Sequence, residues 1–119
     1  MEDCIFCKII KKEVKANIIF ENEVCLAFIP LKPVTDGHIL LVPKDHFENL
    51  FDINNEILKE IIIASKKISS DIFKENQATG INLLHASGKD AQQSVFHFHL
   101  HIVPRRPNDG LDMWIRNKL

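Results

Sequence analysis

The sequence predicts a single α+β domain over residues 1–119, in which an antiparallel sheet of about five strands packs against one long helix. Short segments rich in β-forming residues recur along the chain and are separated by turn residues. One long segment repeats its apolar side chains at the helical period. A length of 119 residues suits one domain with one packed core.

The expected elements follow a simple order along the chain. A short helix comes first, then a hairpin, a third strand, the long helix and two further strands. The ranges expected for these elements are, in chain order, 5–12, 18–21, 24–29, 38–42, 54–73, 81–85 and 97–103.

The long helix carries an apolar stripe that is wider than one sheet face requires. Asp52, Asn54 and Asn55 are candidates for the residue that caps its N-terminus. Three isoleucines in succession, 61–63, widen the stripe. Either the helix also buries surface against a second subunit, or it lies deep in the core.

Composition excludes several classes of partner. The 15 basic and 16 acidic side chains give a net charge of −1, so we expect no binding to nucleic acid or membranes through overall charge. The apolar runs 39–42 and 61–64 are too short to span a bilayer. The first residues lack a secretory pattern, and three cysteines favour reduced thiols or a metal site, so we expect the cytoplasm.

Segment 97–103 alternates histidine with apolar residues. On a strand, His97, His99 and His101 would line one face and the apolar side chains between them the other. The outer two histidines would begin roughly 13 Å apart, whereas zinc–nitrogen bonds measure about 2 Å. The three imidazoles are therefore expected to divide their roles rather than bind one metal together.

This pattern, His-φ-His-φ-His-φ-φ with φ apolar, resembles the signature of the histidine-triad family. The similarity extends from Cys4 to about Trp114. Further matches to the family, the last of them to its bacterial-type branch, are Gly37-His38, Pro43-Lys44, Gln93-Ser94-Val95 and Pro104-Arg105.

The resemblance implies hydrolysis or transfer of a nucleotide through a covalent nucleotidyl-histidine. His99 matches the family nucleophile, and a neutral imidazole is a good nucleophile near pH 7. His101 would bind a non-bridging α-phosphate oxygen, and Ser94 the phosphate or the leaving group. His38 would help to orient the triad, or would simply be a buried core histidine. With His97, these residues form the expected catalytic set.

Nucleotide binding is expected to involve Phe28, Ile29 and Leu31, which could form an apolar slot for the base beside Ser94, His99 and His101. Core packing is the alternative for Phe28. Two positions depart from the family pattern. Pro30 stands where Asp or Asn usually holds the ribose hydroxyls, and Ala86 where Asn or Gln is common. Neither side chain can form those hydrogen bonds, which puts recognition of the ribose and the leaving group in doubt.

Cys4 and Cys7 form a Cys-x-x-Cys motif, which suits a redox pair or a metal site. No βαβ pattern supports the redox alternative. With His46 and His97, the motif resembles the metal site of zinc-containing family members, and thiolates plus imidazoles suit tetrahedral zinc. Four protein ligands would make this Zn²⁺ structural. Cys25, in an apolar strand, is expected in the core.

The leading expectation is a nucleotide-binding hydrolase. It would release a nucleoside monophosphate from adenosine-type phosphoramidates or dinucleoside polyphosphates. The alternatives are a nucleotidyltransferase and a non-catalytic nucleotide- or zinc-binding interaction protein. The resemblance also implies a homodimer. Arg105 and Arg106 are expected to be solvated rather than catalytic, and Trp114 to pack near the ligand or across the dimer.

Overall fold

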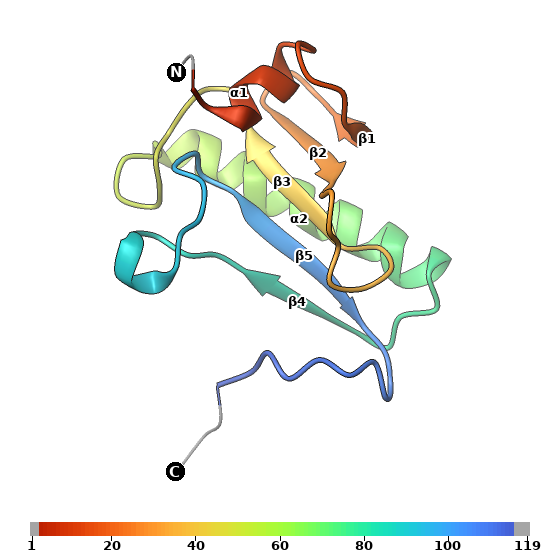
Figure 1. Cartoon of the computed structure of the whole chain (residues 1–119). Helices are drawn as coiled ribbons and strands as arrows, with labels where there is room; N and C mark the ends of the chain where they lie inside the picture. The colour runs from red at the N-terminus through yellow and green to blue at the C-terminus, as the bar shows by residue number, and fades with distance from the viewer. Residues whose placement is uncertain (1–2, 116–119) are drawn as a thin grey trace.

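Five antiparallel strands form the sheet of the computed structural model, which describes residues 3–115 (Figure 1). The strand order is β1-β2-β3-β5-β4. The α+β class, the single long helix and the short N-terminal helix are confirmed. The elements are, in chain order, α1 (Ile5–Ile10), β1 (Asn17–Glu21), β2 (Cys25–Ile29), β3 (Ile39–Pro43), α2 (Asn55–Glu75), β4 (Gly80–Leu84), the short 3-10 helix η1 (Lys89–Ala91) and β5 (Leu100–Arg105).

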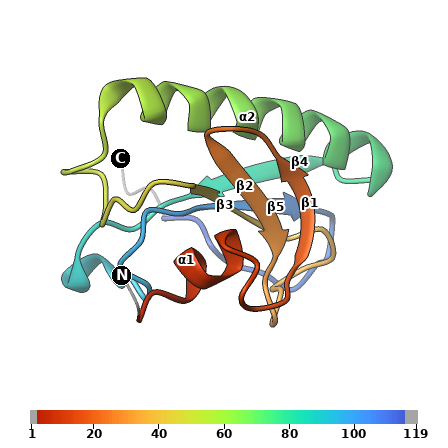
Figure 2. The same cartoon turned by 90° about the horizontal axis from the view of Figure 1, so that it is seen from above.

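The two helices lie on opposite faces of the sheet (Figure 2). Because the central strands are covered on both sides, all of β3 and four of the five residues of β2 are buried. The α2 face buries one half of the core, including Leu41, Ile61, Ile68, Leu100 and Ile102. The α1 face buries the other half, made of Phe6, Ile9, Leu26, Phe28, Leu40 and Val42.

Helix α2 begins after Asn54, whose side-chain oxygen accepts a hydrogen bond from the Ile57 amide at 2.8 Å. Asn54 is therefore the cap among the three predicted candidates. Of the three successive isoleucines, Ile61 is fully buried, whereas Ile62 and Ile63 are 51% and 63% exposed. The excess width of the apolar stripe thus faces solvent rather than the core. Within residues 3–115, no helix combines the length and the apolar character that a membrane span needs.

Strand β5 begins at Leu100, three residues after the predicted start at His97. The predicted start is wrong because the backbone of residues 97–99 is not paired with a neighbouring strand. The Phe98 amide donates to the carbonyl of Phe47, in the loop after β3, at 2.6 Å. Of the three histidines, only His101 lies within the sheet, although the apolar residues between them do face α2.

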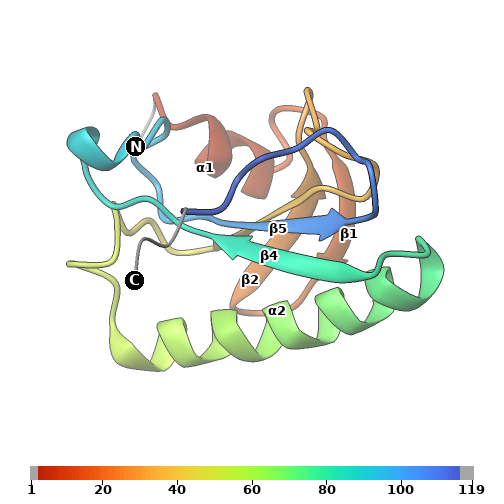
Figure 3. The ribbon, with the colours of Figure 1, turned by 90° about the horizontal axis from the view of Figure 1, so that it is seen from below.

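The segment after β5 turns back along the α1 side of the sheet (Figure 3). Arg105 forms a two-pronged ion pair with Asp109, with nitrogen–oxygen distances of 2.8 and 3.1 Å. Arg106 donates twice to the carbonyl of Asn76, at the end of α2, and once to Thr35 Oγ1 at 3.1 Å. The expectation that both arginines are solvated is wrong, because the following turn supplies acceptors for Arg105 and the end of α2 supplies one for Arg106.

Gly37 allows this region to close tightly. Its φ is +89°, which favours glycine, and a Cβ there would meet the Asn76 side-chain amide and lie 3.0 Å from Pro104 Cγ. The end of α2 and the end of β5 therefore both pack closely against Gly37, the residue that precedes His38.

Candidate functional site

Three histidines, His38, His99 and His101, form a cluster on the α1 face of the sheet. His38 Nε2 lies 3.0 Å from His101 Nδ1, and the ring centroids of His99 and His101 are 5.1 Å apart. His38 and His99 are both only 5% exposed. Helix α1 contributes Phe6, whose ring meets that of His99 edge-on at 5.2 Å. We call these three histidines the imidazole cluster.

Hydrogen bonds assign the protons of the His38–His101 pair. The Val34 amide donates to His38 Nδ1 at 3.1 Å, so the neutral His38 ring carries its proton on Nε2. That proton is donated to His101 Nδ1. The neutral His101 ring must then carry its own proton on Nε2, where it is a donor for a ligand.

His99 has the opposite arrangement. Its Nδ1 lies 2.8 Å from the carbonyl oxygen of His97, which can only accept, so Nδ1 carries the proton. The lone pair of the neutral ring is therefore on Nε2. Burial lowers the pKa of His99 and keeps this ring neutral near pH 7. The cluster thus offers one nitrogen lone pair and one N–H donor.

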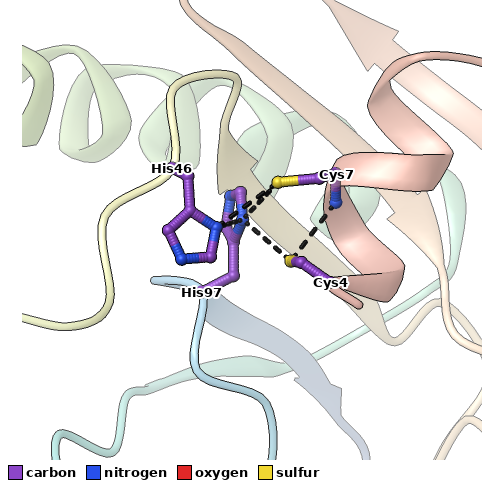
Figure 4. Close-up of side chains that lie close together, drawn as sticks. All are labelled: Cys4, Cys7, His46 and His97. Atoms are coloured by element: carbon purple, nitrogen blue, oxygen red, sulfur yellow. Dashed lines mark hydrogen bonds between the residues drawn. The ribbon is translucent and has the colours of Figure 1, made fainter. Parts of the chain in front are cut away.

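A second cluster, made of Cys4, Cys7, His46 and His97, lies beside the first (Figure 4). The two cysteines come from the start of α1, His46 from the loop after β3, and His97 from the segment before β5. Their four ligand atoms all lie within 4.8 Å of one another. We call these four residues the thiol–imidazole cluster.

The distances between ligand atoms in this cluster suit a cation with tetrahedral coordination. Zinc bond lengths of about 2.0–2.3 Å place neighbouring ligand atoms roughly 3.3–3.8 Å apart. His97 Nδ1 lies 3.4 and 3.5 Å from the sulfurs of Cys4 and Cys7, and 3.1 Å from His46 Nδ1. Burial raises the pKa of Cys7 to about 11, so its thiolate needs a cation close by.

His97 links the two clusters. Its Nε2 donates to the Pro43 carbonyl at 2.9 Å, which leaves the Nδ1 lone pair directed at the two sulfurs and His46. Its backbone carbonyl accepts the Nδ1 proton of His99. The side chain of His97 therefore belongs to the thiol–imidazole cluster, while its backbone holds a ring of the imidazole cluster.

A hollow of about 290 Å³ opens between α1 and the end of β2. Phe28 is 4% exposed and packs edge-on against Phe6 at 5.5 Å, whereas Leu31 is fully exposed. Side chains that line the hollow include Ile9, Val14, Phe28, Ile29, Pro30 and Leu31. All three residues expected to contact the base therefore border one mostly apolar space.

Comparison with known proteins decides the family. Residues 11–108 match the model of the HIT domain. The chain belongs to the histidine-triad (HIT) family.

Known HIT proteins resemble this one over most of its length. A HIT-like protein of Borreliella burgdorferi is 41% identical over 121 aligned residues, which cover all of this chain and 87% of that one. An adenylylsulfatase of Arabidopsis thaliana is 35% identical over 92% of this chain and 55% of its own. The crystal structure of a zinc-bound histidine-triad protein from Mycobacterium smegmatis superposes with a TM-score of 0.90 at 35% identity, covering 94% of this chain and 81% of that one.

Ser94 of this HIT protein lies in the segment between η1 and β5. It is exposed and borders a separate hollow of about 500 Å³, which also touches Cys4, His46, Glu48 and Phe96. Its role toward phosphate or leaving group stays a prediction. The expectations for Ala86, Pro30 and Trp114 likewise stay predictions, and Trp114 is 71% exposed.

Sequence reasoning missed two partners of the HIT histidines. The Val34 amide, which fixes the His38 tautomer, is a backbone group with no sequence signal. His85 carries no expected role in the sequence, yet its ring donates a hydrogen bond to the backbone carbonyl of His99 at 2.9 Å. A histidine at the end of an edge strand is too common for the sequence alone to single it out.

The buried His101 generates a prediction about stability and pH. Burial lowers its pKa from 6.5 to about 4, so the unfolded chain binds a proton here before the folded chain does. The free energy of unfolding therefore does not depend on His101 above about pH 6.5, and it decreases through this residue as the pH falls toward 4. In urea unfolding series, His101→Gln should flatten this loss by on the order of 2 kcal/mol. Equal pH slopes for the variant and the wild type would contradict the assignment.

Proposed function

We propose that this HIT protein hydrolyses adenosine-type phosphoramidates or dinucleoside polyphosphates at the α-phosphate. The reaction passes through a nucleotidyl group on His99 and releases a nucleoside monophosphate. The observation that carries this proposal is the pair of complementary tautomers. His99 presents a lone pair at Nε2, and His101 presents an N–H donor on the same face of the sheet.

In the first step, His99 Nε2 attacks the α-phosphorus. A P–N bond forms while the P–N or P–O bond to the leaving group breaks, and the leaving group departs with the bonding electron pair and takes a proton from solvent. Positive charge develops on the His99 ring. The His97 carbonyl, which accepts the Nδ1 proton at 2.8 Å, stabilises that charge.

The His101 donor lowers the barrier for both steps. Its Nε2 proton bonds a non-bridging oxygen of the α-phosphoryl group, where negative charge must be stabilised in the transition state. Water then attacks phosphorus and loses a proton to solvent, the P–N bond breaks with its electrons returning to His99, and the monophosphate leaves. The His38 Nε2–H bond holds His101 in the required tautomer throughout.

The apolar hollow beside α1 suits the base of the nucleotide. Phe28, Ile9 and Val14 contribute apolar side chains to its lining, and its volume of about 290 Å³ admits a flat heterocycle. Pro30 in the same wall has no side-chain hydrogen-bonding group for the ribose, so we expect weak discrimination between ribose and deoxyribose. The adenylylsulfatase relative supports hydrolysis of an adenylyl group rather than its transfer to another acceptor.

We further propose that the thiol–imidazole cluster holds Zn²⁺. The zinc-bound relative supports this metal, and four protein ligands leave no open position for substrate, so its role is structural. It would fix the side chain of His97 and thereby the carbonyl that orients His99. A reducing compartment such as the cytoplasm keeps the two thiols available as ligands.

We also propose that the protein is a homodimer that uses the open face of α2. Ile62, Ile63 and Phe73 are 51%, 63% and 45% exposed and lie outside the buried stripe of the helix. Leu58 and Lys59 border a shallow hollow of about 390 Å³ with the two isoleucines. An apolar helix face of this kind suits burial against a second copy about a two-fold axis. With a net charge of −1, the chain has no overall positive charge that would attract nucleic acid.

Replacing His99 by alanine tests the nucleophile. We expect turnover to fall by several orders of magnitude while nucleotide affinity stays within about tenfold, because the lost group acts in the covalent step. Denaturing mass spectrometry after brief mixing should find a nucleotidyl adduct in the wild type alone, and the adduct should decay in water. A His99→Ala variant with more than a tenth of the wild-type kcat would show that His99 is not the nucleophile.

Cys4→Ser and Cys7→Ser test the metal centre. Each should lower the zinc content and reduce Tm by about 5 °C or more, because a metal that binds only the folded chain stabilises it. Cys25→Ala is the matched control, since this thiol lies in the core and outside the cluster. Its zinc content should stay at the wild-type level. Elemental analysis that finds no zinc in gently purified wild type sinks the proposal.

Light scattering tests the dimer. The wild type at micromolar concentration should give twice the chain mass of 13.7 kDa, and Ile63→Glu should give the single mass because a charge on the apolar face opposes its burial. Ile19→Glu is the control and should remain dimeric. Ile19 is exposed on the edge strand β1 and borders Ile68 and Ile72 of α2, not the isoleucines of its open face. A wild type of single mass contradicts the proposal.

A further inference from the structure

The nucleophile lies just outside the sheet, so its backbone is not held by strand pairing. On the β3 side the pairing of β5 starts at Leu100, and on the β4 side at His101. The carbonyl of His99 instead accepts a hydrogen bond from the ring of His85, with a nitrogen–oxygen distance of 2.9 Å. A side chain therefore takes the place of the missing strand neighbour.

His85 reaches this carbonyl from the face opposite the imidazole cluster. Leu84 is the cross-strand partner of His101, so the two side chains share a face and the residue after Leu84 points the other way. There the His85 ring stacks on Phe98, with centroids 4.4 Å apart and planes tilted by 27°. The ring is half-buried.

The tautomer of His85 is fixed by the groups around it. A carbonyl oxygen can only accept, so Nδ1 carries the proton, and Nε2 accepts the hydroxyl proton of Ser87 at 2.6 Å. The Ser87 oxygen in turn accepts the Leu50 amide at 2.9 Å. Hydrogen bonds thus run without a break from the loop before α2 to the backbone of His99.

We infer that His85 is a positioning residue for the nucleophile. Its Nδ1 proton fixes the peptide group that follows His99, while the His97 carbonyl fixes the His99 ring from the other side. Together the two contacts set the direction of the Nε2 lone pair. A misplacement of about 1 Å in such a group can cost roughly 100-fold in rate. The kinetic consequence rests on the proposed function, whereas the contact itself does not.

Two substitutions separate the hydrogen bond from the packing. His85→Phe keeps an aromatic ring on Phe98 and removes both hydrogen bonds. His85→Asn places an amide donor where Nδ1 stands and so retains the bond to His99. We expect His85→Phe to lower kcat by about 10- to 100-fold with KM within about threefold, and His85→Asn to keep kcat within about threefold of the wild type.

Ile68→Val is the control for stability. Ile68 is buried in the core on α2, away from the junction of β4 and β5, and its truncation lowers Tm modestly without touching this contact. Its kcat should equal that of the wild type. A His85→Phe protein that keeps more than half of the wild-type kcat overturns the inference, as does an equal loss of kcat in the Asn and Phe variants.

A spectroscopic measurement decides the contact without turnover. In nitrogen-15 spectra the His85 ring should be protonated at Nδ1, and the carbon-13 resonance of the His99 carbonyl should shift in His85→Phe but not in His85→Asn. A ring protonated at Nε2, or a carbonyl resonance unmoved in His85→Phe, overturns the inference. If the expected spectra accompany a wild type that hydrolyses no nucleotide, the contact is supported and the proposed hydrolase function fails.

Discussion

The hydrogen bond from His99 Nδ1 to the carbonyl oxygen of His97 joins the two centres of this molecule. It leaves the lone pair of His99 on Nε2, and it places the acceptor on a residue whose ring lies among Cys4, Cys7 and His46. The start of α1 and the loop after β3 therefore contribute to the orientation of His99, although neither lies beside it in the sequence. In this family member the N-terminal helix therefore helps to build the surroundings of His99.

Much of the fold was predictable because each element carries its own local signal. The helical period marks α2, and Asn54 caps it through a hydrogen bond to a residue only three positions further along the chain. The alternation around His101 marks β5 and correctly places the apolar residues toward α2. The predicted start of that strand at His97 was wrong, although the sequence pattern there suits a strand. The His97 ring and the Phe98 amide instead contact groups in the loop after β3. Periodicity cannot register such contacts.

The site was predictable only in part. The thiol–imidazole cluster came from the family resemblance, since no local rule connects Cys4 with His97. The tautomers of the imidazole cluster depend on a backbone amide at Val34 and a ring at His85, both fixed by tertiary structure. Arg106 shows the same limit: a charged residue after a strand is usually solvated, yet here the carbonyl at the end of α2 is its acceptor.

The sequence distances within the site have a consequence for biosynthesis. Cys4 and His97 are 93 residues apart, His38 and His101 are 63 apart, and Thr35 and Arg106 are 71 apart. Each contact closes a long stretch of chain, which costs entropy that only the finished core repays. During translation, the early strands and α2 leave the ribosome long before the partners of His38 and Cys4 exist. Both clusters therefore assemble only once β5 is in place, in the same event that completes the sheet.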